Sequence, residues 1–245
     1  MKSTQGLAAL VLLATTTAAH AEFSGTVTAT TDYDWRGVTQ TAQDPALQGS
    51  LDYATDFGLY AGAWASNVDF GPGDPNVEID FYVGWGGGET LLWDVGAIYY
   101  VYPGESDFNF PEIYGSLGWE FIEGKISYSW DFAGTSETAF YYEANVDYGL
   151  PANFGVIGHI GYSDGDGITA AYSNYDVNGN IVEEVDNYMD WAVGITYTWG
   201  HFDLALKWVD GEDLETKRDT VDDISSSEAR AIFSVSTTFP WSKDE

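Results

Sequence analysis

The sequence predicts an all-β fold: a single transmembrane antiparallel β-barrel of about twelve strands. Apolar and polar residues alternate along most of the chain, which is the pattern of strands whose two faces meet different surroundings. Each alternating segment has about the 9–11 residues that a tilted strand needs to cross a bilayer. Short and long connections follow one another in turn, as they do in single-chain barrels of the outer membrane.

The first segment, 23–36, shows the alternation most clearly. One face carries apolar residues and ends on Tyr33 and Trp35, which suits an aromatic girdle, whereas the other carries Ser and Thr followed by two Asp and an Arg. The segment 59–68, rich in Gly and Ala, shows no preferred orientation. The other strands are expected at 46–54, 59–68, 77–85, 91–102, 110–119, 122–132, 139–148, 154–163, 188–199, 202–209 and 230–239.

The connections between the expected strands favour a barrel over a soluble β-sandwich. A periplasmic sandwich that binds carbohydrate through its aromatic residues would alternate in the same way, but its crossings give no reason for a short–long order. With the first strand starting in the periplasm, the short periplasmic turns fall at 55–58, 86–90, 120–122, 149–153 and 199–201. The longer extracellular loops fall at 37–45, 69–76, 103–109, 134–138, 164–186 and 210–228.

Residues 1–21 have the pattern of a cleaved signal peptide. Lys2 precedes a short apolar run at 7–14, and Ala19-His20-Ala21 places small residues where signal peptidase requires them. The run is much shorter than the roughly 20 residues of a membrane-spanning helix. The sequence therefore predicts a signal peptide at 1–21, export to the cell outer membrane, and a barrel over 22–245.

Composition limits the partners that this chain can bind. The formal net charge of −31 argues against binding to nucleic acid, whose phosphates would repel it. The chain contains no Cys and three His, so thiolate chemistry is excluded and a transition-metal site is not expected. The expected partners are outer-membrane lipid and lipopolysaccharide, small polar or cationic solutes, and the barrel-assembly machinery; no cofactor is expected.

Several blocks of sequence resemble the TorF family of porins from proteobacteria. Residues 27–40 (VTATTDYDWRGVTQ) with 45–49 (PALQG) resemble the opening of that family. Later blocks are similar at 58–68, 78–80, 93–96, 100–104 and 112–116. The resemblance covers the signal sequence and most of the mature chain and implies a porin, without catalytic or ligand residues. The tail 240–245 departs from barrels that end on an aromatic residue, since Phe239 is followed by Pro-Trp-Ser-Lys-Asp-Glu.

The faces expected to line the barrel interior carry many more carboxylates than basic groups. Such groups are tolerated in a barrel wall only where water, cations or basic partners reach them. The predicted function is passive diffusion of small polar or cationic solutes through an acidic lumen. The candidate pore-lining residues are Asp32, Asp34, Arg36, Asp52, Glu78, Asp80, Asp94, Glu112, Lys125, Glu143, Asp147, Asp190, Asp203, Lys207 and Arg230.

Two other interpretations of the barrel remain open. In the first, the lumen is narrow and plugged by an ionic network in which Arg36, Lys125 and Arg230 pair with acids. In the second, the barrel is a non-conducting structural or adhesive protein that binds a partner through the loops 164–186 and 210–228.

Catalysis and metal binding have little support in the sequence. His159 and Ser163 fall on one face of an expected strand, but no Ser lies in a nucleophile-elbow context, so we do not expect an enzyme. Asp164-Gly165-Asp166-Gly167 resembles a fragment of a calcium loop yet lacks its later ligands. This fragment is expected to be a solvated loop.

Overall fold

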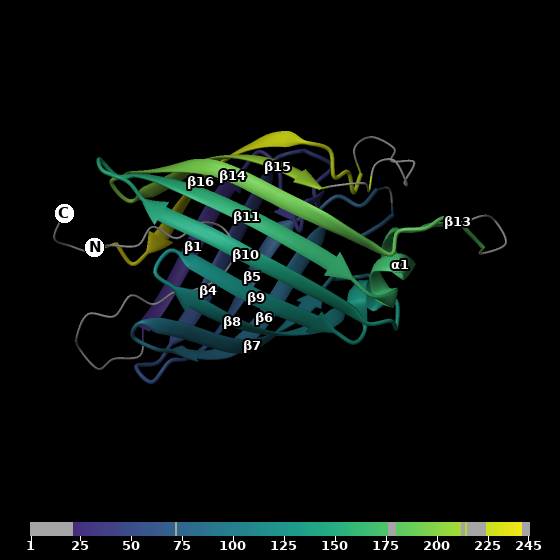
Figure 1. Ribbon diagram of the computed structural model, residues 1–245, viewed down its shortest axis with the longest axis horizontal. Helices are drawn as coiled ribbons and strands as arrows, with labels where there is room; N and C mark the ends of the chain where they lie inside the picture. The colour runs from purple at the N-terminus through teal and green to yellow at the C-terminus, as the bar shows by residue number, and fades with distance from the viewer. Residues whose placement is uncertain (1–21, 72, 176–179, 212–213, 215–223, 242–245) are drawn as a thin grey trace.

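Twelve antiparallel strands close into one barrel in the computed structural model, which describes residues 22–71, 73–175, 180–211, 214 and 224–241 (Figure 1). Strands adjacent in the barrel follow one another along the chain, and β1 pairs with β16 to close it. The predicted fold class is confirmed. The predicted signal peptide 1–21 and residues 242–245 of the tail lie outside the described residues. The barrel strands are β1 (Glu22–Thr30), β4 (Ala46–Ala54), β5 (Leu59–Asn67), β6 (Val77–Gly87), β7 (Leu91–Val101), β8 (Phe110–Trp119), β9 (Ile122–Ser129), β10 (Ala139–Gly149), β11 (Phe154–Asp164), β14 (Asn187–Trp199), β15 (Phe202–Gly211) and β16 (Arg230–Phe239).

The first strand is shorter than predicted, because the chain leaves the barrel wall after Thr30. It then forms a hairpin of β2 (Asp34–Trp35) and β3 (Val38–Thr39). The hairpin turns at Arg36 and Gly37, whose φ angles of 53° and 81° are those of a two-residue type I′ turn. The hairpin is itself extended, so the alternation continues through it and does not distinguish wall from insertion.

The predicted outward girdle at Tyr33 and Trp35 is therefore wrong. The Trp35 ring stacks on Phe132 with a centroid distance of 5.9 Å, and the Tyr33 hydroxyl donates to Glu78. Phe132 was expected to be the last residue of the strand 122–132. It belongs instead to the short helix η2 (Phe132–Gly134) and is buried.

The loops at the end of the barrel opposite the short turns carry further small elements. These are η1 (Ser106–Phe108), α1 (Asp166–Tyr172), β12 (Asn174–Tyr175) and β13 (Ile181–Glu183), and α1 lies at the mouth of the barrel in Figure 1. The expectation of a solvated loop at 164–167 is wrong, because α1 begins at Asp166 and buries Gly167 and Ile168. No helix in the described part of the chain is long and apolar enough to cross a membrane.

The two faces of the barrel wall differ as the alternation predicts. Outward-facing side chains are large and apolar, with Leu51 74% and Val193 54% exposed. Cross-strand partners share a face, so register assigns orientation where the sequence did not. In β5, Trp64 pairs with Ser50 and Asp80, which places it on the inner face.

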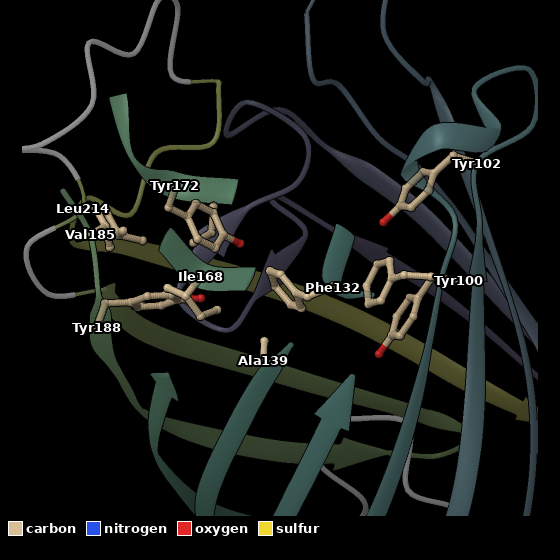
Figure 2. Close-up of a cluster of buried hydrophobic side chains, with 11 residues drawn as sticks. Tyr100, Tyr102, Phe132, Ala139, Ile168, Tyr172, Val185, Tyr188 and Leu214 are labelled. Atoms are coloured by element: carbon tan, nitrogen blue, oxygen red, sulfur yellow. The ribbon is translucent and has the colours of Figure 1, made fainter. Parts of the chain in front are cut away.

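The buried apolar side chains gather inside the barrel, at the end where the long loops meet. Tyr100 and Phe110 stack at 4.3 Å between ring centroids, and Trp35 of the hairpin packs against this cluster. Figure 2 shows side chains of α1, η2 and the strand ends converging there. We call this group the aromatic plug: Val38, Tyr100, Tyr102, Phe110, Phe132, Ala139, Ile168, Tyr172, Val185, Tyr188 and Leu214.

Tyrosine rings on the inner face lie over glycines of neighbouring strands. A Cβ atom added at Gly84 would collide with the Tyr60 ring, and one added at Gly96 would collide with Tyr114. The absence of a side chain at these glycines thus lets each ring lie flat along the wall, and keeps the ring out of the middle of the lumen.

The substitution Gly84→Ala should lower the free energy of unfolding by about 1–3 kcal/mol, because the added methyl group displaces the Tyr60 ring. Urea titration of the refolded protein measures this change. The control is Gly118→Ala, where the nearest atom to the added Cβ is 3.6 Å away. Equal losses at both sites would contradict the role of the ring.

Candidate functional site: the barrel lumen

The inner face of the barrel has two halves of different exposure. Near the short turns, Asp94, Glu123 and Asp203 are only partly buried. Toward the long loops the inward-facing acids are almost completely buried, with Glu78 2% and Glu112 1% exposed. The aromatic plug and the β2–β3 hairpin occupy this second half, so the interior is filled near the long loops and more exposed to solvent near the short turns.

Arg230, the first residue of β16, holds the base of the hairpin. Its Nε lies 2.5 Å from Asp32 Oδ2, and its Nη2 lies 2.7 Å from Asp34 Oδ1. Its Nη1 donates to the carbonyl oxygens of Gly37 and Glu228. A single buried guanidinium therefore satisfies two acids and two carbonyl groups, and fixes the hairpin to the last strand.

Arg36 lies at the tip of the hairpin and reaches the opposite wall. Its Nη2 donates to Glu112 Oε2 on β8 at 2.5 Å, and its Cζ lies 4.3 Å from the ring centroid of Tyr141 on β10. Burial by itself would lower the pKa of Arg36, but the Glu112 carboxylate outweighs burial and raises that pKa above its ordinary value. A Cβ atom at Gly37 would lie 2.6 Å from Asp190 Cβ, so the tip fits closely against β14.

A second polar network crosses β9, β10, β11 and β14. Lys125 Nζ lies 3.4 Å from Glu143 Oε1. His159 Nε2 lies 2.8 Å from Asp190 Oδ1, and His159 Nδ1 lies 2.7 Å from Asn145 Oδ1. Both ring nitrogens of His159 therefore have polar partners other than a serine. The Ser–His pairing considered from sequence finds no support in these contacts.

Tyrosine hydroxyls serve many of the remaining acids. Tyr33 and Tyr102 both donate to Glu78 at 2.9 Å, Tyr60 donates to Asp94 at 2.7 Å, and Tyr82 donates to Asp52. Sequence reasoning missed these donors because it counted tyrosine as apolar. The signal was present for Tyr82 and Tyr102, which fall in the same phase as the acids of their strands, but not for Tyr33, which falls in the apolar phase of the segment 23–36.

The structure places all fifteen predicted site residues inside the barrel, in two groups. Three lie on the inward-folded segment after β1, namely Asp32, Asp34 and Arg36. The other twelve lie at inward-facing positions of the wall: Asp52, Glu78, Asp80, Asp94, Glu112, Lys125, Glu143, Asp147, Asp190, Asp203, Lys207 and Arg230. The pairing of Arg36, Lys125 and Arg230 with acids, which the plugged-lumen interpretation requires, is present. Within the described ranges, no three His, Asp or Glu side chains are grouped to hold a metal ion.

A closed antiparallel barrel with an apolar exterior and a polar interior is the architecture of outer-membrane β-barrel proteins. Within that class, the chain belongs to a family of bacterial proteins of unknown function (Gcw_chp), whose model matches residues 14–239. No curated protein matches the sequence.

Solved structures of outer-membrane channels share this fold at low sequence identity. The NanC porin is 10% identical with a TM-score of 0.55, over 89% of this chain and 100% of that one. The KdgM porin is 8% identical with a TM-score of 0.52, over 89% and 99%. The COG4313 outer membrane channel from Pseudomonas putida F1 is 8% identical with a TM-score of 0.50, over 91% and 96%. At such identities the similarity concerns the fold alone.

Replacing Arg230 by Gln should lower the free energy of unfolding by about 3–5 kcal/mol, because it leaves Asp32 and Asp34 buried without their cation. Chemical denaturation of the purified protein gives this value. Glu89→Gln, in an exposed turn, is the control and should change stability little. If the two variants are equally stable, Arg230 does not hold the hairpin.

Proposed function

We propose that this protein is an outer-membrane channel for passive diffusion of small polar or cationic solutes. The observation that supports it best is the closed barrel whose exterior is apolar and whose interior is rich in carboxylates. The resemblance to TorF family porins and the fold shared with solved channels agree with this proposal. In it, residues 1–21 direct export, the barrel-assembly machinery inserts residues 22–245, and lipid and lipopolysaccharide surround the apolar belt.

The proposed pore is lined by the partly buried charges near the short turns and closed in this conformation at the long-loop end. Asp32, Asp34 and Glu112 there pair with arginines, and the hairpin and aromatic plug fill the space between them. Conduction then requires the segment 31–45 to leave the lumen. Because Thr30 and Ala46 pair directly in the wall, this segment can move while β1 and β4 stay together.

A second candidate is a non-conducting barrel that binds a partner through the loops 164–186 and 210–228. The filled long-loop end favours it, since Ile168 of α1 and Leu214 belong to the aromatic plug. Such packing fixes the described parts of these loops around Ile168 and Leu214, which suits a binding surface; residues 176–179, 212–213 and 215–223 of the loops lie outside the described residues. Conductance of the refolded protein separates the two candidates.

Replacing residues 32–44 by a short glycine-rich turn should increase single-channel conductance in planar bilayers severalfold over the unmodified protein, because it removes the hairpin from the lumen. The matched control is the pair Thr39→Cys and Ser226→Cys, which joins the hairpin to the loop before β16. Thr39 N donates to Ser226 O at 2.9 Å, and the chain has no other Cys. The locked form should conduct little even under voltages that open the unmodified channel. A shortened barrel that conducts no ions would favour the non-conducting candidate.

In the variant that lacks residues 32–44, the double substitution Glu123→Lys and Asp203→Lys should move the cation-to-anion permeability ratio severalfold toward anions. Both acids face the lumen and are partly exposed, so their charges act on passing ions. The reversal potential in a salt gradient measures the ratio. Glu89→Lys in an exposed turn is the charge-matched control, and a ratio unchanged in the double variant would mean that these acids do not line the pore.

A further inference from the structure

The Arg36 side chain contacts the inner face of the barrel wall in the way that a separate, bound cationic molecule would. The wall contributes the buried carboxylate of Glu112 on β8 and the ring face of Tyr141 on β10, and both contact the guanidinium. A carboxylate beside an aromatic face is a favourable site for guanidinium and alkylammonium groups. The arginine itself comes from the hairpin and is not part of the wall.

The same stretch of wall holds acceptor atoms that the hairpin does not satisfy. Among the described residues, Glu112 Oε1, Asp80 Oδ1 and Ser127 Oγ are buried without a hydrogen-bond partner. Asp80 is 9% exposed and pairs in register with Tyr100 on β7, the strand between β6 and the β8 strand that carries Glu112. Ser127 pairs in register with Tyr141, beside the arginine.

These unpartnered atoms indicate a ligand with more donors, or another orientation, than Arg36 provides. The guanidinium has five N–H donors, and one of them makes the bond to Glu112. Buried acceptors in proteins nearly always have partners, so unpartnered ones beside a bound cation call for an explanation.

From these contacts we infer that Glu112, Tyr141 and Asp80 form a binding site for small guanidinium or alkylammonium solutes, which Arg36 fills in this conformation as an internal ligand. This inference rests on the proposed channel function and specifies its solute class. A solute of this kind that reaches the wall competes with Arg36 for Glu112. Its binding therefore favours release of the hairpin tip.

The test is chemical rescue of Arg36→Ala by methylguanidinium. The purified variant in detergent should have a lower Tm than the unmodified protein, because Glu112 loses its cation. Millimolar methylguanidinium chloride should recover much of the lost Tm, whereas sodium chloride at equal ionic strength should not. In Arg36→Ala with Glu112→Gln the rescue should disappear, and Asp80→Asn in the Arg36→Ala background should weaken it.

Rescue that is absent in Arg36→Ala, or equal with and without Glu112, would overturn the inference. If Arg36→Ala does not fold, Arg36→Met retains the bulk of the side-chain stem, and saturation-transfer NMR on methylguanidinium then reports binding to the folded barrel. Lack of saturation transfer with Glu112 intact also counts against the site. If the barrel binds methylguanidinium but never conducts ions, the channel proposal is refuted and the binding-site inference stands. If the barrel conducts ions but shows no rescue, only the binding-site inference is refuted.

Discussion

The pairing of β1 with β16 is the contact on which the rest of the structure depends. It closes the sheet, so no strand edge is left with unpaired backbone groups, which a bilayer could not satisfy. Closure also creates an interior, and the alternation of each strand then directs every second side chain into it. The many acids of this chain are thereby placed together in a confined space, and the polar networks follow from the need to satisfy them.

The molecule stabilises most of its interior acids in one of two ways. Arg230, Arg36 and Lys125 supply charge, and tyrosine hydroxyls supply hydrogen bonds where no cation is near, as at Glu78. Near the long loops this network merges with the aromatic plug, so polar and apolar packing fill the same end. The result is a lumen with an exposed half and a buried half, and the hairpin belongs to the buried one.

The alternation in the sequence was sufficient to predict the barrel strands. Ten of the twelve strands lie within two residues of their expected bounds. The inner face was also predictable, since strand periodicity alone directs Glu112 or Asp190 inward. The hairpin at 34–39 was not predictable, because an extended insertion has the same period as the wall. The pairing of Arg36 with Glu112, 76 residues away, depends on the closed tertiary structure and leaves no local signal.

The ion pair between Arg230 and Asp32 joins residues 198 positions apart, the last strand to the segment after the first. Loop-closure entropy makes so distant a contact one of the slowest to form, and it becomes possible only once β16 has reached β1. The contact that fixes the base of the hairpin therefore forms together with closure of the barrel or after it. A barrel still open during assembly has this arginine unpaired, so the step that joins the last strand to the first also determines when the hairpin is fixed in the interior.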